Sequence, residues 1–358
     1  MTHSLPRRTL SFARCASMTL SLALALTFAF SVAHSGASHA KGKKFKIATI
    51  APDGTPWAQF LTQFKKRVRK QSEKALKPLV YLNGIKGDEQ SIVRQVYAGK
   101  LQMGGVSTGA LSTVVPDMDI LELPYAFPDF ASADRTLEEV RPLVEEILNT
   151  KGLTLVMYSE NGYRSFATKD KCVKKPADLK SVKMRSQESQ VHLETYRALG
   201  ASPIAISVGE VVSSLKTGVV SGFDNTAIIT QALGWDQMIK YFSKTNHIYQ
   251  PALIIANKKW LESLSEEHQA LIRENARKLE KPGRQLVRAI EPALIKNFEA
   301  QSVEVCTLSK AEVKAFQDAT RSVWELRNKK ATPLGKKLIK MMKCLTADSK
   351  ATLKSCGG

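Results

Sequence analysis

Two arginines and an asparagine are the residues of this chain whose types and positions best fit a binding chemistry. Arg164, Arg185 and Asn225 each stand at the end of a short stretch that is expected to form a strand. Open α/β sheets bind ligands at the carboxyl ends of their strands, and a guanidinium offers two parallel donors that match a carboxylate. A single arginine at a sheet edge more commonly makes a structural salt bridge. Three such residues together favour a site for an organic anion.

A serine within a glycine-rich turn offers a different chemistry. Gly105–Gly109 matches the G-x-S-x-G pattern, in which Ser107 would be an acyl-transfer nucleophile. That geometry needs a buried strand before the serine and a long helix after it, whereas the preceding residues are weakly apolar and Pro116 limits the helix. A close turn beside a cavity is therefore favoured. A serine hydrolase that uses Ser107 with a histidine such as His247 stays as the alternative function. Nucleotide-binding and zinc-protease patterns are absent from the sequence, so no cofactor is predicted.

The first forty residues have the features of an export signal. Three arginines and no acidic residue precede an apolar run of 16 residues, Met18–Ala33, and small residues then lead to Ser38-His39-Ala40. The run is shorter than the roughly 20 residues of a membrane-spanning helix. We expect cleavage after Ala40, with an uncleaved anchor as the alternative, and the sequence leaves open whether export uses the general or the twin-arginine route.

Length and composition indicate a folded, basic protein of about two domains. Removal of the leader leaves 318 of the 358 residues, with a formal charge of +17, and no second stretch long enough to span a membrane. An apolar fraction of 43% excludes wholesale disorder, and no repeat of fixed period is found. The basic cluster Lys65–Lys70 lacks interleaved exposed aromatic residues, so nucleic-acid binding is not expected.

Four cysteines follow the leader, and an even number in an oxidising compartment predicts disulfides. Three pairings are possible. The short loop between Cys344 and Cys356 favours one bridge there, which leaves Cys172 with Cys306. The spacing is not that of a zinc site, so no metal is predicted.

Strand and helix signals alternate along the chain, which predicts parallel α/β sheets with helices on both faces. Thr55 and Pro56 begin one helix, and Asp88 or Glu89 begins another that ends at Gly99. We expect a strand and then an aromatic loop over Met118–Phe130, a capping box at Ser207–Glu210, and a long helix after Ser265 that Pro282 and Pro292 bend or break. The basic tail from Ala331 is predicted to be helical and packed on the outside. Further expected strands and helices cover 45–50, 79–82, 153–158, 182–185, 191–199, 204–206 and 219–225.

Several of these segments together resemble one protein family. The run Asp178–Asn225 resembles the DctP-type solute-binding proteins of TRAP transporters, and so do Gly87–Glu89, Leu123–Phe127 and Lys240–Tyr249. The motifs agree in order and spacing, and the similarity extends to about Ala319.

The resemblance implies a non-enzymatic periplasmic receptor that delivers an organic carboxylate to a TRAP permease. It implies an α/β, two-domain periplasmic-binding-protein architecture with crossing strands and a long shared helix. Domain I would be 41–161 with about 251–290, domain II would be 162–250 with about 291–330, and 331–358 would form a C-terminal tail. The ligand would lie in the cleft between the domains.

The same resemblance assigns roles to single residues. Arg185 would grip the ligand carboxylate, assisted by Arg164 and Asn225, while His247 is expected to be structural. The remaining ligand contacts that it implies are Glu89, Tyr125, Phe127 and Val208.

Departures from the family pattern lie around the expected pocket. Ser221-Gly222 replaces the usual Asp-Gly, Val208-Gly209 stands where an aromatic residue is common, and Ser186-Gln187 replaces Val-Pro. These departures leave the predicted anion-binding residues in place and change the shape of the pocket wall around them. We therefore expect a monocarboxylate whose body is bulkier or more apolar than that of a four-carbon dicarboxylate.

Overall fold

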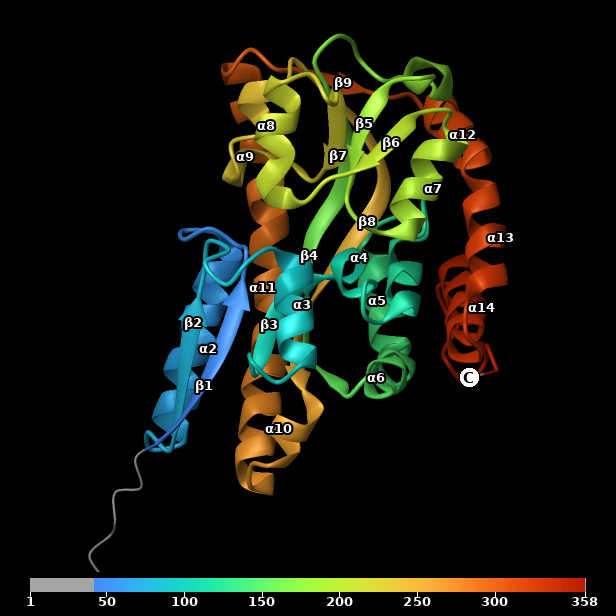
Figure 1. The fold of residues 1–358 in the computed structure, drawn as a ribbon. Coiled ribbons are helices and arrows are strands. Elements are labelled where there is room, and N and C mark those ends of the chain that lie inside the picture. The colour runs from blue at the N-terminus through green and yellow to red at the C-terminus, as the bar shows by residue number, and fades with distance from the viewer. Residues whose placement is uncertain (1–41, 358) are drawn as a thin grey trace, which may run out of the picture. The chain divides into compact units, whose positions relative to one another are not determined.

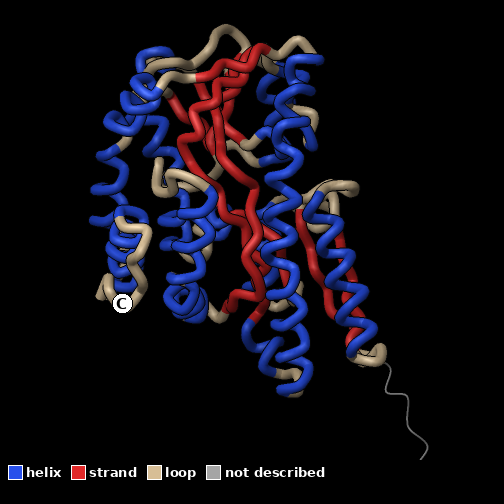
Figure 2. The backbone as a smooth tube through the Cα atoms, turned by 180° about the vertical axis from the view of Figure 1, so that it is seen from behind, coloured by secondary structure: helices blue, strands red, loops and turns tan. Residues whose placement is uncertain are grey.

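The computed structural model describes residues 42–357, so the predicted leader and its cleavage site lie outside the described residues. Within this range, nine strands form one mixed sheet in the order β2-β1-β3-β8-β4-β7-β5-β6, and β9 pairs with β8 (Figures 1 and 2). The strands are β1 (Lys43–Thr49), β2 (Leu76–Tyr81), β3 (Met103–Ser107), β4 (Leu153–Thr168), β5 (Lys183–Ser186), β6 (Ser202–Ala205), β7 (Gly222–Asn225), β8 (Tyr241–Asn257) and β9 (Glu304–Thr307).

Helices flank this sheet and connect its strands (Figure 1). The α-helices are α2 (Pro56–Gln71), α3 (Glu89–Tyr97), α4 (Thr108–Leu111), α5 (Phe130–Glu139), α6 (Arg141–Asn149), α7 (Gln190–Ala198), α8 (Val211–Lys216), α9 (Ala227–Ala232), α10 (Lys258–Glu262), α11 (Glu266–Ala300), α12 (Lys310–Ala319), α13 (Arg321–Lys330) and α14 (Pro333–Ala347). The 3-10 helices are η1 (Pro116–Glu122), η2 (Pro176–Leu179), η3 (Val208–Glu210) and η4 (Asp236–Met238). None of the helices within 42–357 is both long enough and apolar enough to cross a membrane.

Two lobes share the long central elements. Lobe I contains β1, β2 and β3 with α2–α6, and lobe II contains β5, β6 and β7 with α7–α9. Strands β4 and β8 pair antiparallel along nearly their whole length and pass through both lobes. Helix α11 packs on α2 and β4 and also on α9 and β9 (Figures 1 and 2). This is the predicted architecture of two α/β domains with crossing strands and a shared helix. The expected domain boundaries, 161/162, 250/251 and 290/291, fall inside these three shared elements.

Local sequence signals account for the helix ends that position the site. The Thr55 hydroxyl accepts a hydrogen bond from Ala58 N, and Pro56 occupies the first helical position of α2, as predicted. The Asp88 carboxylate caps α3 by accepting from Ser91 N at 2.7 Å. Gly99 then ends the turn after α3 with a φ of +72°, which glycine adopts without strain.

The segment Met118–Phe130 departs from its prediction. Its first part is the 3-10 helix η1 and not a strand. The turn places two buried carboxylates against Arg327 of α13: Arg327 Nε donates to Asp119 at 2.6 Å and Nη2 to Asp117 at 2.7 Å. Those ion pairs depend on a residue about 200 positions away, so the local pattern of apolar residues could not show them.

Three other predictions need correction. The sheet is mixed and not parallel, because β4 and β8 run antiparallel to each other, β8 runs antiparallel to β3, and β4 runs antiparallel to β7. The capping box at Ser207 was wrong, since its hydroxyl donates to the Glu210 carboxylate at 2.8 Å and no side chain caps the turn. Of the two effects predicted for Pro282 and Pro292, a bend or a break, the break does not occur, because α11 runs continuously over 35 residues and packs on both lobes.

Candidate ligand-binding site

A cleft lies between the two lobes, with an empty volume of about 700 Å³ counted together with the solvent at its mouth. Five of the predicted site residues line it: Glu89, Arg164, Arg185, Val208 and Asn225. Apolar side chains make much of the remaining wall, among them Ile50, Trp57, Phe60, Leu61, Val106, Ile229, Leu253 and Ile254. Further polar groups come from Thr49, Gln90, Ser159, Asn161, Gln187 and Gln250.

Arg185 is a buried cation that makes no ion pair with any carboxylate of the described residues. It lies near the end of β5, is 2% exposed, and its Nε donates to the carbonyl of Ile206 at 2.9 Å. Its guanidinium carbon lies 5.2 Å from the centre of the Trp235 ring. Among residues 42–357 no carboxylate oxygen comes within 4.0 Å of it. Burial, and to a lesser degree the charge of Arg164, lowers the pKa of Arg185 to about 10, so it stays protonated at neutral pH.

Arg164, in contrast, has its charge balanced within the protein. It lies inside β4 and not at a strand end as predicted, and its Nε donates to Asp224 at 2.6 Å. Its Nη1 donates to Asn225 Oδ1 at 3.1 Å and to Gln250 Oε1 at 2.9 Å. Burial alone would raise the pKa of Asp224, but the charge of Arg164 holds it well below its usual range. Arg164 therefore organises the floor of the cleft.

Asn225, the last residue of β7, keeps a donor for a ligand. Its Oδ1 accepts from Arg164 and from Thr226 N at 2.9 Å. Its Nδ2 makes no hydrogen bond within the described part of the chain. The fixed oxygen orients the side-chain amide, so Nδ2 is left to donate into the cleft beside Arg185.

Glu89 contributes a carboxyl group from the opposite lobe. It begins α3 and accepts from Ser107 N at 2.6 Å and from Ser107 Oγ at 3.0 Å. Burial raises its pKa, although the two bonds from Ser107 oppose this. A ligand hydroxyl can donate to this carboxyl, whereas a second ligand carboxylate near it would be repelled.

The hydrolase alternative is not supported by this geometry. Ser107 is 1% exposed, donates to Glu89 and accepts from Ala110 N as the cap of the four-residue helix α4. No histidine of the described residues hydrogen-bonds to it. His247 instead bonds to Thr245 Oγ1 at 2.8 Å and stacks on Phe166 at 4.1 Å between ring centres. The G-x-S-x-G match marks a turn and not a nucleophile.

A buried polar network under the cleft was missed by the sequence reasoning. Glu122 of lobe I accepts from Thr108 Oγ1 at 2.6 Å, from Gln250 Nε2 at 2.9 Å and from Gln187 Nε2 at 3.1 Å, and it contacts His192 Nε2 at 2.5 Å. The only residue in the sequence that could have indicated this network was Gly109, whose N–H also donates to Glu122. A Cβ there would overlap Gln187. The network joins lobe I to lobe II behind Arg164.

The structure does not bring Tyr125 and Phe127 into the cleft. They line a separate pocket with Tyr163 and Lys244. Tyr125 N donates to the carbonyl of His247 at 2.7 Å, and Phe127 meets the Tyr249 ring edge-on at 5.4 Å between ring centres. These aromatic residues pack the loop after η1 against β8, and they belong to no ligand site that we propose.

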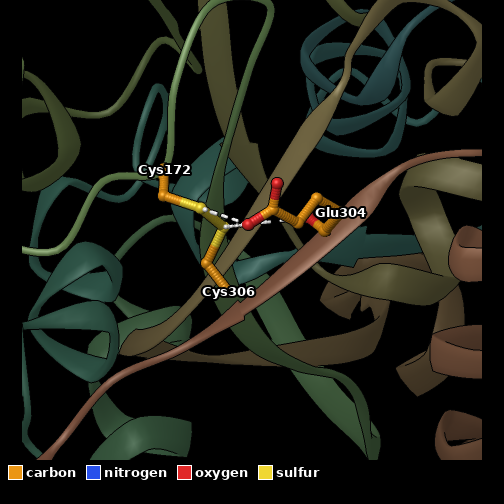
Figure 3. Close-up of side chains that lie close together, drawn as sticks. All are labelled: Cys172, Glu304 and Cys306. Atoms are coloured by element: carbon orange, nitrogen blue, oxygen red, sulfur yellow. Dashed lines mark hydrogen bonds between the residues drawn. A yellow bond between two sulfur atoms is a disulfide. The ribbon is translucent and has the colours of Figure 1, made fainter.

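Both expected cysteine pairs are bonded. The Cα atoms of Cys172 and Cys306 lie 6.0 Å apart, and those of Cys344 and Cys356 lie 5.9 Å apart. Figure 3 shows the carboxylate of Glu304 beside the first pair, with Oε1 at 3.4 Å from Cys172 Sγ. Because both sulfurs are bonded to each other, this group has no thiolates with which to hold a metal ion.

Sequence and structure comparisons decide the family. Residues 47–330 match the DctP family, described as bacterial extracellular solute-binding protein, family 7. The chain belongs to this family. It is 28% identical to the 2,3-diketo-L-gulonate-binding periplasmic protein YiaO of Escherichia coli over 78% of this chain and 84% of that one.

Solved structures give the same result. A TRAP periplasmic solute-binding protein of Bradyrhizobium, in complex with galacturonate, is 30% identical with a TM-score of 0.79, covering 86% of this chain and all of that one. One from Pseudomonas putida with bound D-glucuronate is 28% identical with a TM-score of 0.78, covering 87% and 99%. The family and fold are those of transport binding proteins, as predicted.

Proposed function

We propose that this protein is a periplasmic, non-enzymatic receptor that captures a hydroxylated monocarboxylate, of the size of a six-carbon sugar acid, for a TRAP permease. The observation that carries this proposal is Arg185. A guanidinium that is buried and has no carboxylate of the protein beside it costs stability, and an anionic ligand in the cleft compensates that cost. Export with cleavage after Ala40 would deliver the chain to the compartment in which such a receptor works.

The groups around Arg185 support the ligand class. The carboxylate of the ligand pairs with the guanidinium and accepts from Asn225 Nδ2, both on lobe II. Glu89 on lobe I accepts from hydroxyl groups at the other end of the ligand and disfavours a second carboxylate there. Two relatives with the same fold hold galacturonate and D-glucuronate, which are acids of this kind. Because much of the cleft wall is apolar, a branched or aromatic carboxylic acid is the alternative ligand class to a sugar acid.

Closure of the lobes follows from the placement of these contacts. A ligand drives a conformational change only through contacts that it gains in one state. Here the carboxylate contacts lie on lobe II, while Glu89 and Trp57 belong to lobe I. Only a closed form brings both sets to one ligand at once, and this form is the one that the permease would recognise.

A thermal-shift screen of the chain without its leader tests the proposal. The panel contains D-galacturonate, D-glucuronate, galactonate, succinate and a branched-chain acid. A ligand at a hundredfold excess over its Kd stabilises the protein by about 2.7 kcal/mol. We expect large shifts for sugar acids with wild type, none with Arg185→Met, and unchanged shifts with the exposed control Arg69→Met. Equal shifts for succinate, or shifts that survive Arg185→Met, would contradict the proposal.

A further inference from the structure

The C-terminal segment forms a cap on lobe I that lies beyond the family match. The match ends at residue 330, where α13 ends, and α14 and a loop closed by the Cys344–Cys356 disulfide follow. Helix α14 buries Leu338, Ile339, Met341, Met342 and Leu345, and it packs against α5, α6 and η1 (Figure 1). One face of α14 is thus fixed to the protein.

The opposite face of α14 is a row of exposed lysines. Lys336, Lys340 and Lys343 recur at four- and three-residue spacing on one side of the helix, and Lys337 lies beside them. Further exposed lysines lie at the end of α13 and in the disulfide-closed loop. We call this set the basic face: Lys329, Lys330, Lys336, Lys337, Lys340, Lys343, Lys350 and Lys354.

The basic face carries an unbalanced charge. Within residues 42–357, no carboxylate oxygen lies within 4.0 Å of any of its eight ammonium groups. Residues 321–357 hold ten basic and two acidic residues, so these 37 of the 316 described residues carry +8 of a net +16. Arg327 in the same segment differs, because it is buried and paired with Asp117 and Asp119. The two acidic residues of this segment therefore form no ion pair with the lysines of the basic face.

The residue types on this face identify the kind of partner. Protein interfaces are enriched in aromatic residues and arginine and depleted in lysine, whereas lysine clusters are typical of segments that bind anionic lipid. Leu326, 40% exposed, is the one large apolar side chain that is exposed in the described part of 321–357. A diffuse anionic surface suits this composition better than a specific protein site.

We propose that the basic face docks the receptor on anionic phospholipid headgroups of the membrane that holds its permease. No residue of 321–357 lines the ligand cleft, so the lysines that would contact lipid are separate from the residues that would contact the ligand. The attraction keeps the receptor close to the membrane surface and declines with ionic strength, because exposed charges are screened. Each lysine near such a surface strengthens binding by about fivefold.

Vesicle sedimentation with the chain that lacks its leader tests this proposal. Vesicles of phosphatidylcholine with about 30% phosphatidylglycerol are compared with phosphatidylcholine alone. The test variant is Lys336→Gln, Lys337→Gln, Lys340→Gln and Lys343→Gln together. The matched control removes four exposed cations elsewhere, with Lys46→Gln, Lys66→Gln, Arg69→Gln and Lys70→Gln. Sugar-acid binding by both variants shows that they are folded, and direct vesicle binding is measured independently of any ligand.

We expect wild type and control to bind the anionic vesicles, and the test variant, which lacks four lysines, to bind them about 600-fold more weakly. Salt raised from about 0.05 to about 0.5 M should abolish binding. Equal binding by the test and control variants, or no binding by wild type, would overturn the proposal. If the test variant instead loses binding only to permease held in neutral-lipid nanodiscs, the basic face contacts the permease and the lipid proposal is wrong.

Discussion

At the scale of single residues, the two cleft arginines have opposite roles although they share a type and a neighbourhood. Arg164 neutralises Asp224 at 2.6 Å, whereas Arg185 has no carboxylate partner among the described residues. Removal of one member of a buried ion pair strands the other charge and costs about 3–5 kcal/mol. Arg164→Met should therefore lower the free energy of unfolding by about that amount. Urea denaturation of the ligand-free protein measures this.

Arg185→Met, in contrast, should not lower the free energy of unfolding in the same urea denaturation assay. It removes a buried charge that no carboxylate of residues 42–357 pairs with, so the ligand-free variant should be at least as stable as wild type while it loses the ligand. Arg185→Lys controls for the loss of volume. A loss of several kcal/mol in both methionine variants would show that Arg185 is a structural residue.

Glu89 should make selectivity depend on pH. Burial raises its pKa, so the carboxyl takes up a proton at a higher pH than an ordinary glutamate does. Above that raised pKa it is ionised and repels a second ligand carboxylate, which weakens binding by at least about tenfold, because charges even ~12 Å apart interact that strongly at an effective dielectric constant of ~20. The ratio of succinate Kd to galacturonate Kd should thus fall as pH is lowered through the pKa. Titration calorimetry across pH measures it.

The Glu89→Gln variant is the control for this pH dependence. It lacks the titrating group, so its ratio of dissociation constants should be smaller than that of wild type and flat with pH. A ratio in wild type that stays constant with pH would mean that Glu89 does not face the distal end of the ligand.

The sequence indicated cleft residues for which we propose ligand contacts and missed those that support them. Arg185 and Asn225 could be predicted to lie at a site because strand-end arginines and amides have a known use and the family motif repeats them, and both line the cleft. The ion pair of Arg164 depends on β7 lying beside β4, and the network around Glu122 depends on four segments meeting. No local sequence pattern predicts which distant segments lie side by side. Asp224, which directly precedes Asn225, could however have been considered as an ion-pair partner of Arg164.

At the scale of secondary structure, the crossing strands contain a break that suits a hinge. The register between β4 and β8 shifts between Glu160 and Gly162, opposite Pro251 and Gln250. The predicted domain boundaries fall at the same positions, 161/162 and 250/251. A bulge locally interrupts strand pairing, and we propose that the lobes rotate here.

Gly162→Ala tests this hinge with little steric side effect. The glycine has a φ of +95°, and a Cβ added there would meet no atom within 4 Å. Any effect therefore comes from the backbone, with a cost of about 1–2 kcal/mol. We expect lower stability and a weaker ligand-induced compaction in small-angle scattering. The exposed Gly152→Ala, which also has a positive φ and open space, is the control. Compaction equal in both variants would place the hinge elsewhere.

The two disulfides should contribute unequally to stability. Cys344–Cys356 has a sequence separation of 12 residues and Cys172–Cys306 one of 134. In the loop-entropy description these separations correspond to about 3 and about 5 kcal/mol. Replacement of both cysteines of a pair by serine should therefore lower the thermal midpoint more for Cys172–Cys306 than for Cys344–Cys356. A larger effect of the short loop would indicate that it stabilises α14 mainly through native contacts.

Element prediction succeeded where the signal was local and failed where it was not. The cap predicted at Thr55 is confirmed, and so are the helix starts predicted at Asp88 or Glu89 and after Ser265, where Asp88 and Ser265 also cap their helices by accepting from a backbone N–H three residues away. The strand predicted from Met118 is the helix η1, which Arg327 stabilises from α13. Antiparallel crossing of β4 and β8 likewise has no signature in either strand alone.

At the scale of the whole molecule, the proposed ligand binding, lobe closure and membrane docking would use separate parts. The residues proposed to contact the ligand line the cleft from both lobes, the shared strands connect the lobes, and the basic face lies on the C-terminal cap. This separation allows lysine variants to change membrane association without changing ligand affinity. It also means that the proposed ligand binding can be tested without a membrane.

The measurement that tests the central claim most directly is a calorimetric double-mutant cycle between the ligand carboxylate and Arg185. D-galacturonate and D-galactose, which lacks the carboxylate, are titrated into wild type and Arg185→Met. The account predicts that loss of the carboxylate costs wild type about 100-fold in affinity and costs the variant almost nothing further. Equal losses in both proteins would show that Arg185 does not hold the carboxylate and would contradict the account.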